Sequence, residues 1–575
     1  MVDDQPAEQE VEQDTSPDRR MGCFWRAAGL ILVILIAGTI YRQFTSIPLR
    51  ISEETTHITE PLTSDGKHVD YFAAIEQEAY PEGMATEKNG YRLIVEHLGM
   101  PEDCSLEDYR EIRRKLGLAP STTDNQPDMS FQEPHDFLTE YFASERFDEA
   151  LVKDLLAPET PAEDALEDDS AAGAGEAGTS ENGYVDEETR SGQRVAERGY
   201  DLSSDPEAAV LALADRFGAA WTLNELPMMD EWLKNNGPAL DLVSRAVRQP
   251  VFRVPLARED REDENGTLWD LLLISHVQQV RGFARGLSAR AYYRIGTGQI
   301  DKAIDDIATC KRLGRHVQNG TMLVESLVGI AVEGIADSIG VGDVLKDPPT
   351  KEQLRRLLRE MNDLPPRDSL QKTLRFERYV LLDVVQLLSQ GKGSFDYFFD
   401  RYSPMISRCI ETVGLDWNVI ARRLNQHFDT LLETGRAPPR ASMYRLTAIS
   451  IRERSKIVAD MLGNLLLPSF EAVREATRRS QCVEHMKRIT LAMLIYERDH
   501  RTLPPAYSAD EDGNPLHSWR VLLLPDLGKQ EQELYEKIRI DEPWDSEHNR
   551  QFHEKPVQFY RCPSDSVAGP GQTSY

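Results

Sequence analysis

Few side chains in this 575-residue sequence stand at the spacings that catalysis requires. Glu497 and His500 lie one helical turn apart, but a di-iron bundle needs that pair twice together with further carboxylates. Glu333 and Asp337 could pair as acid and base on one helical face, yet the sequence supplies no nucleophile beside them. Motifs of phosphate loops, serine hydrolases, zinc proteases and CxxC redox proteins do not occur. We therefore predict no catalytic residue and no cofactor.

An acidic loop is the first candidate for a metal site. Asp510, Asp512 and Asn514 have the oxygen density of a partial calcium loop. The remaining ligands of an EF-type loop are missing, so a plain turn is the favoured interpretation and no metal site is predicted.

Two cysteines are the other candidates. Cys482 and Cys562 lie near the two ends of the C-terminal region and could form a disulfide outside the cytoplasm. With His485 and His500 they also have the residue types of a zinc site, although their spacing is irregular. Cys310 and Cys409 are expected in the core.

A long helix must position these residues. Apolar side chains recur at steps of three and four between Ser469 and Tyr496, with arginines and lysines between them, which predicts an amphipathic helix. Pro504 and Pro505 forbid its continuation. Beyond them we expect a small α+β globule with a turn at 512–515, a short helix capped by Ser518 and a strand over Val557–Tyr560.

The same region resembles a known family. The matching stretches are LLLPSFEAVREATRRSQC, LPPAY, HSWRVLLLP, IRIDEPWDSEHNR and YRCPSD. They are similar to the pseudopilin-like domain of unknown function that is abundant in planctomycetal secreted and membrane proteins and is related to the G-type pseudopilins of type II secretion. The resemblance covers about one fifth of the chain and implies a role in the cell envelope, linked to secretion or surface assembly.

The chain departs from that family's pattern at several points. Asp460 and Asn464 interrupt the stretch that would embed a pilin in the membrane, and the prepilin cleavage signature is missing. Glu484 and His485 replace the familiar Asn-Asn after the cysteine. We expect residues 461–575 to be a truncated, internal module that docks on the preceding helical domain through the side chains of Leu465, Leu466, Leu467, Phe470 and Val473.

A membrane segment is predicted near the N-terminus. Residues 23–42 form an apolar stretch close to the ~20 residues that span a bilayer, flanked by Arg26 and Arg42. A cleaved signal peptide is the alternative interpretation. We expect a single-pass protein of the cytoplasmic (inner) membrane whose large C-terminal part is extracytoplasmic.

Two acidic segments account for most of the net charge of −31. Residues 1–18 hold seven carboxylates and residues 159–188 hold eleven, with few large apolar side chains. Such composition predicts a disordered tail over 1–22 and a disordered linker over 157–203. Because phosphates would be repelled, no nucleic-acid partner is expected.

The remaining sequence is predicted to be mainly helical. Apolar stripes ending at Gly99 and Gly117 indicate a small helical domain over 65–156. A larger α-helical domain over 204–460, a bundle or a short α-solenoid, includes a helical hairpin broken at 296–298 and a helix opened by Thr350 and Gln353. We predict a non-catalytic interaction or scaffold protein that binds other envelope proteins. The alternative is an envelope hydrolase with its site in the helical domain.

Overall fold

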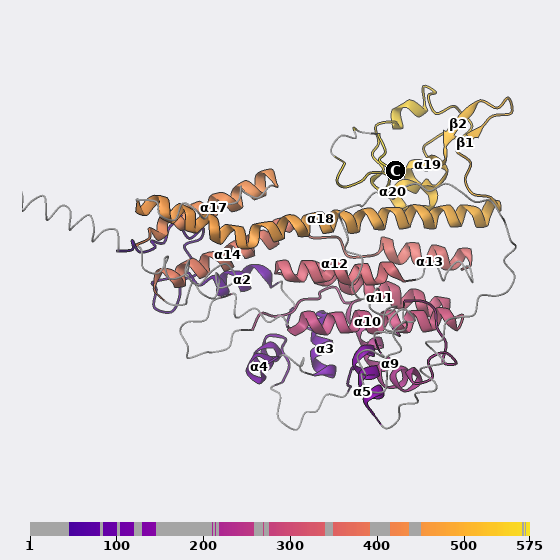
Figure 1. The fold of residues 1–575 in the computed structure, drawn as a ribbon. Coiled ribbons are helices and arrows are strands. Elements are labelled where there is room, and N and C mark those ends of the chain that lie inside the picture. The colour runs from indigo at the N-terminus through magenta and orange to yellow at the C-terminus, as the bar shows by residue number, and fades with distance from the viewer. Residues whose placement is uncertain are drawn as a thin grey trace, which may run out of the picture. The chain divides into compact units, whose positions relative to one another are not determined.

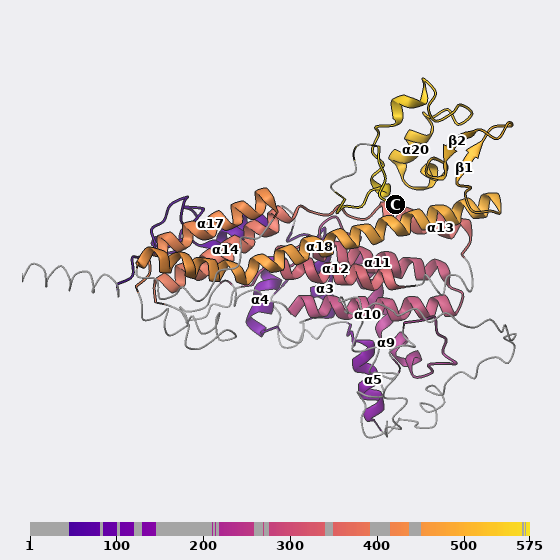
Figure 2. The same cartoon turned by 45° about the horizontal axis from the view of Figure 1, so that its top comes forward.

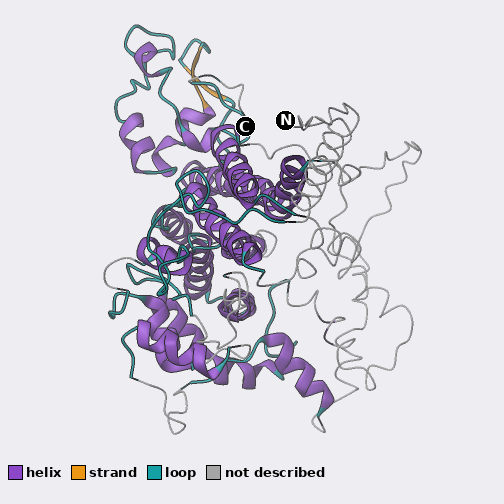
Figure 3. Cartoon of the chain, turned by 90° about the vertical axis from the view of Figure 1, so that its left-hand side faces the viewer, coloured by secondary structure: helices purple, strands orange, loops and turns teal. Residues whose placement is uncertain are grey.

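The computed structural model describes residues 45–80, 84–99, 104–119, 129–144, 218–257, 275–339, 349–391, 414–435, 450–565 and 571–575, with the single residues 210, 213, 268 and 569. These residues are mainly helical, as predicted, and they contain one two-stranded sheet (Figure 3). The predicted tail 1–22, membrane segment 23–42 and linker 157–203 lie outside the described residues, as does Cys409. Of the helices in the described ranges, none has the length and apolar character needed to span a bilayer.

The chain folds into two compact units that interleave along the sequence. The first comprises residues 1–71, 263–268 and 378–468, and the second comprises 72–262, 269–377 and 469–575. The predicted domains 65–156, 204–460 and 461–575 are consecutive segments, so their boundaries differ from these units. The units follow packing between helices that are distant in the sequence.

The first unit is built on α17 (Trp417–Thr434), the C-terminal half of α14 (Leu370–Ser389) and the beginning of α18 (Ile451–His500). Side-chain amides fasten the extended segment 45–71 to these helices. Asn418 donates to Pro48 O at 2.8 Å and accepts from Arg50 N at 2.9 Å. The Gln386 amide makes two 3.0 Å hydrogen bonds with the backbone of Val69. Buried amides thereby satisfy backbone groups that have no strand partner.

Nine helices of the described residues precede α14. They are α2 (Tyr71–Ala79), α3 (Gly90–Leu98), α4 (Leu106–Lys115), α5 (Pro134–Ala143), α9 (Met229–Ala246), α10 (Ser275–Gly296), α11 (Ile300–Gln318), α12 (Leu323–Ser338) and α13 (Lys351–Asn362). The predicted cap of α13 is confirmed, because Thr350 and Gln353 form a capping box there. At the start of α4, Ser105 accepts from Asp108 N. Gly99 and Gly117 follow α3 and α4 with positive φ, as the sequence indicated.

The core of the second unit lies around the predicted helical hairpin of α10 and α11. Figures 1 and 2 show α10, α11 and α12 side by side. Trp232, Phe283 and Leu287 are fully buried there, and Cys310 is fully buried too, as predicted. The hairpin breaks after Gly296, as expected, and Gly298 takes φ +71° in the turn.

Two glycines let α11 and α12 touch through their backbones. A Cβ at Gly329 would lie 2.2 Å from Gln318 N, and one at Gly314 would lie 2.8 Å from Gly329 O. Any side chain at this crossing would therefore push the helices apart. The close approach places Arg315, which follows Gly314, within reach of Glu333, one turn beyond Gly329.

Helix α18 leads into a small globule. After α18 come β1 (Tyr507–Ala509), β2 (Pro515–Ser518), α19 (Trp519–Leu522), η2 (Leu524–Asp526), α20 (Lys529–Tyr535), η3 (Asn549–Phe552) and η4 (Gln558–Tyr560). The strands are antiparallel, with Tyr507 opposite Ser518. Ser518 caps α19, as predicted. Residues Leu523, Leu527 and Phe559 pack against Ile489 of α18.

The predicted strand over Val557–Tyr560 is wrong. Gln558–Tyr560 form a 3₁₀ turn in which Tyr560 N donates to Val557 O at 3.1 Å. Phe559 and Tyr560 are adjacent and both buried, whereas neighbouring strand residues would point to opposite faces. The turn places both rings in the core, which alternation could not do.

Candidate functional site

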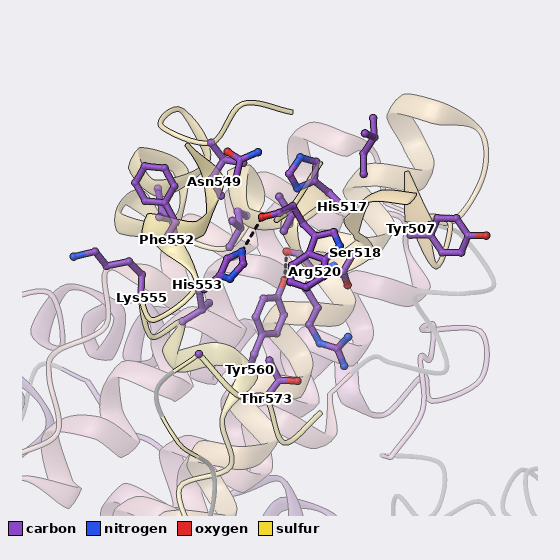
Figure 4. A pocket seen from close by; sticks show the side chains of 18 of the residues that line it. Tyr507, His517, Ser518, Arg520, Asn549, Phe552, His553, Lys555, Tyr560 and Thr573 are labelled. Atoms are coloured by element: carbon purple, nitrogen blue, oxygen red, sulfur yellow. Dashed lines mark hydrogen bonds between the residues drawn. The ribbon is translucent and has the colours of Figure 1, made fainter. Parts of the chain in front are cut away.

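A pocket of about 560 Å³ opens in the C-terminal globule (Figure 4). Its walls come from the β1–β2 hairpin, the end of α20, the segment 544–557 and the final residues 571–573. Val521 and Leu524 contribute apolar lining between these walls, with Leu534 and Ile538 beside them. Such a concave, mainly apolar shape is typical of binding sites.

The long loop beside the pocket is held by one amide. Asn549 accepts from Arg539 N at 3.0 Å, and its amide donates to the carbonyl oxygens of Arg539 and Pro543 at 2.9 and 3.1 Å. Asn549 is 3% exposed. One buried side chain thus closes the loop 539–549 and fixes the wall that it forms.

Three further polar side chains of the pocket are hydrogen-bonded to its walls. His517 Nε2 donates to Arg539 O at 3.2 Å, and His553 Nε2 donates to Trp544 O at 2.7 Å. The Tyr560 hydroxyl donates to Arg520 O at 2.8 Å (Figure 4). These bonds pre-form the pocket, because the groups that shape it already have their partners.

Aromatic rings stand exposed among the lining residues. Trp544 is 54% exposed and Tyr507 is 53% exposed. Trp544 stacks on His553 with ring centroids 5.2 Å apart, and its backbone N–H donates to Leu516 O at 2.9 Å. A large apolar surface is therefore presented to solvent by a side chain that is held in place.

The lining of the pocket is mainly apolar and aromatic. None of the described lining residues carries a carboxyl group, and Ser518 Oγ accepts from Arg520 N as a helix cap. The pocket offers apolar surface, aromatic rings and the exposed Lys555 instead.

A buried charge cluster holds α18 against the helices of the second unit. Glu484 of α18 lies 3.0 Å from Arg315 of α11 and 2.9 Å from Arg367. Arg315 also pairs with Glu333 of α12 at 2.7 Å, and Arg488 pairs with Glu484 at 2.6 Å. Although burial opposes it, attraction from these arginines lowers the pKa of Glu484 to about 2. The carboxylate therefore stays charged inside the unit.

The cluster explains the two acidic residues that the sequence singled out on α12. Glu333 is fully buried between Arg315 and Arg367. Asp337 lies one turn on and receives the ammonium groups of Lys311 and Lys487. Both carboxylates serve as partners in structural ion pairs.

A second group of buried carboxyls marks the start of α12, and sequence reasoning missed it. Glu325 accepts from Thr321 N at 2.6 Å and Met322 N at 2.8 Å, and Glu377 accepts from Leu323 N at 2.8 Å. His276 Nε2 lies 3.0 Å from Glu325. Burial raises the pKa of Glu377 to about 7. The geometry is that of a helix cap, because both carboxyls bind the unpaired amides of a helix start.

The candidate metal ligands Asp510, Asp512 and Asn514 are hydrogen-bonded to one another within their loop. Asp510 Oδ1 accepts from Asp512 N at 3.0 Å and Asn514 N at 2.8 Å, which makes the expected turn between β1 and β2. His500 stacks on Tyr496 with centroids 3.9 Å apart. Across the described residues, no three His, Cys, Asp or Glu side chains gather in a way that could hold a metal ion.

The two cysteines of the predicted disulfide share a neighbour. Both are free thiols, and the Tyr575 hydroxyl donates to Cys482 Sγ at 3.0 Å. Burial, followed by hydrogen bonding with Cys482, raises the pKa of Tyr575, and Cys562 contributes to the same shift. The thiols therefore approach one hydroxyl from both ends of the module, and their disulfide stays a prediction.

The predicted docking contact is described in part. Phe470 is 6% exposed and Val473 is fully buried. The side chains of Leu465, Leu466 and Leu467 lie outside the described residues.

Comparison with known proteins identifies the C-terminal region. Residues 471–575 match the model of a family described as a protein of unknown function (DUF1559), which agrees with the predicted resemblance and covers the C-terminal fifth of the chain. No curated protein and no solved structure matches the chain.

Proposed function

We propose that this chain is a membrane-anchored envelope protein that acts by binding another protein through the pocket of its C-terminal module. The observation that carries the proposal is a convergence of sequence motifs. LPPAY supplies Ala506 and Tyr507, HSWRVLLLP supplies His517 to Leu524, IRIDEPWDSEHNR supplies Ile538, Trp544 and Asn549, and YRCPSD supplies Tyr560. Stretches that carry the family resemblance, although separated in the sequence, meet around one cavity.

The exposed rings favour a protein partner. Tyr and Trp are enriched among the residues that dominate binding energy at protein interfaces, and a preorganised ring loses little entropy on binding. Trp544 and Tyr507 both line the pocket and are exposed, so the matching partner segment places an aliphatic or aromatic side chain against this apolar surface. Lys555 at the same opening favours an acidic neighbour in that segment.

The membrane anchor rests on the sequence of residues 23–42. Its uncharged run between Arg26 and Arg42 supports insertion, and the acidic leader before it is unlike the start of a signal peptide. In this proposal the helical body carries the module on the outer side of the membrane.

Site-directed crosslinking in cells tests the binding role. A photo-reactive amino acid in place of Tyr507 should crosslink one defined protein, and Trp544→Ala in the same chain should abolish that product. Glu536→Ala, an exposed substitution on the module outside the pocket lining, is the matched control and should leave the product unchanged. A product that persists in Trp544→Ala would show that the pocket does not bind the partner.

A further inference from the structure

A second cavity, of about 510 Å³, lies in the helical part of the second unit. Its lining comes from α11, α13 and α18 together with the ends of α10 and α12, and it is separate from the pocket of Figure 4. Most lining side chains are aliphatic, including Ile304, Leu354 and Leu491. Its volume is in the range of small-molecule sites, roughly 300–1,000 Å³.

The cavity exposes apolar surface that the fold leaves uncovered by described residues. Val483 and Met486 of α18 both line it, and they are 44% and 47% exposed. Both residues stand on the helix that is otherwise fixed by the buried charge cluster. Exposed aliphatic side chains along one concavity favour an apolar occupant.

Two ammonium groups are the charged members of the lining. Lys311 Nζ lies 2.8 Å and Lys487 Nζ lies 3.0 Å from the same atom, Asp337 Oδ1. Two cations thus share one carboxylate oxygen. One positive charge of this trio remains uncompensated at the wall of an apolar cavity.

The Lys311 ammonium lacks a hydrogen-bond partner among the described residues. The Lys311 side chain is 4% exposed. The contact with Asp337 is close enough for an ion pair but does not have hydrogen-bond geometry. The Lys311 nitrogen has almost no accessible surface, so it adds positive charge to the cavity wall without meeting an occupant directly. The ammonium within reach of an occupant is that of Lys487, whose side chain is 23% exposed.

We propose that this cavity binds a single aliphatic chain that ends in an anionic group, with the chain against the leucines and isoleucines and the anion at Lys487, beside the buried charge of Lys311. A free fatty acid and a lysophospholipid share this chemistry. The proposal is independent of partner binding by the C-terminal module, because the two cavities have no lining residue in common.

Photolabelling of the full chain in native membranes tests the proposal. The probe is a palmitic acid that carries a diazirine in its chain, and the label should map by mass spectrometry to peptides within 351–361 or 482–494. Unlabelled palmitate should compete, whereas hexadecanol should compete at least about tenfold less well, since a bond to a charged group is worth roughly 1.5–3 kcal/mol. Each methylene removed from a competing fatty acid should weaken competition roughly fourfold.

The two sources of the ligand separate in the same assay. Stronger competition by palmitate than by palmitoyl-lysophosphatidylglycerol assigns the site to free fatty acids, and the reverse order assigns it to lysophospholipids. Either order supports a single-chain anionic amphiphile. Equal competition by hexadecyltrimethylammonium would overturn the proposal, because a cation cannot use these lysines.

Variants localise the effect. Val483→Trp should fill the cavity and remove the label, and Leu327→Trp, an exposed position of α12 outside the lining, should keep it. Lys487→Gln leaves Lys311 and Asp337 as a neutral pair, so palmitate should compete about tenfold less well while hexadecanol is unchanged. Labelling that maps elsewhere overturns the proposal. So does absent labelling with self-association that Val483→Trp abolishes, which would make a second copy of the chain the occupant.

Discussion

Two buried carboxyl groups of the second unit should make the stability of the protein depend on pH in opposite directions. Glu377 has its pKa raised by burial, and Glu484 has its pKa lowered by three arginines despite burial. A raised carboxyl pKa opposes folding once the group must ionise, whereas a lowered one supports folding while the group is charged.

Glu377→Gln should stabilise the protein at alkaline pH. The folded pKa of about 7 lies above the ordinary value of 4.5, so the contribution of Glu377 is fully present below pH 4.5 and is lost as pH rises through 7. The loss amounts to about 3 kcal/mol. Gln keeps the acceptor for Leu323 N without titrating. Urea unfolding at pH 5 and pH 8 should show the variant gaining on the wild type only at pH 8.

A suitable control is Glu352→Gln, an exposed substitution on α13. An equal difference between Glu377→Gln and the wild type at both pH values would mean that Glu377 does not titrate in this range.

Glu484→Gln should destabilise the protein near neutral pH. Neutralising this carboxyl leaves Arg315 and Arg367 short of a buried counter-charge, which typically costs about 3–5 kcal/mol. The stability supplied by Glu484 is present above pH 4.5 and is lost as pH falls through 2. Glu475→Gln, whose side chain is 47% exposed on the same helix, should change stability by less than about 1 kcal/mol. If both variants lost a comparable amount of stability, the charge cluster would not be the cause of the loss in Glu484→Gln.

Cys482 and Cys562 should be linked in protein isolated from an oxidising compartment. Peptide mapping without reductant should then find one disulfide-joined pair, and Cys482→Ser should release the partner peptide. The buried Cys310 should remain a thiol in the same digest, because burial raises its pKa to about 12. Recovery of both peptides unlinked from extracytoplasmic protein would refute the pairing.

At the scale of elements, the crossing of α11 and α12 depends on its glycines. Gly329→Ala should destabilise by about 1–3 kcal/mol, because its Cβ would meet Gln318 N. Gly334→Ala on the same helix meets nothing within 4 Å and should stabilise by roughly 0.5–1 kcal/mol through helix propensity. Thermal unfolding of both variants checks the contrast, and a similar shift in both would mean that the crossing can relax.

Sequence signals within a few residues predicted many of the helices. The other features depend on contacts between residues that are distant in the sequence. Capping residues and apolar spacing placed α4, α13 and the α10–α11 hairpin, because those signals act within a few residues. Val557–Tyr560 was assigned to a strand because apolar content does not distinguish a strand from a turn buried against a helix. The pocket escaped sequence reasoning since its walls meet only when Asn549 closes a loop on Arg539. Glu377 caps α12 from 54 residues away, and no local pattern marks such a contact.

At the scale of the whole molecule, the anchor can be tested by extraction. We expect the protein to stay with membranes at alkaline pH, since the uncharged run within residues 23–42 is long enough to remain in the bilayer. Protease added outside the cytoplasmic membrane should digest the large C-terminal part. Release into the soluble fraction would indicate a cleaved signal peptide, and protection would indicate the opposite orientation.

The position of Glu484 in the charge cluster limits which C-terminal modules this helical body can carry. Glu484 belongs to the C-terminal module, and it contacts two arginines contributed by the helical body. A module with an amide or an apolar side chain at position 484 would leave both guanidinium groups without their anion. The module therefore cannot be exchanged for one that lacks this carboxylate without a loss of stability. The module and the helical body thus depend on each other for stability at this contact.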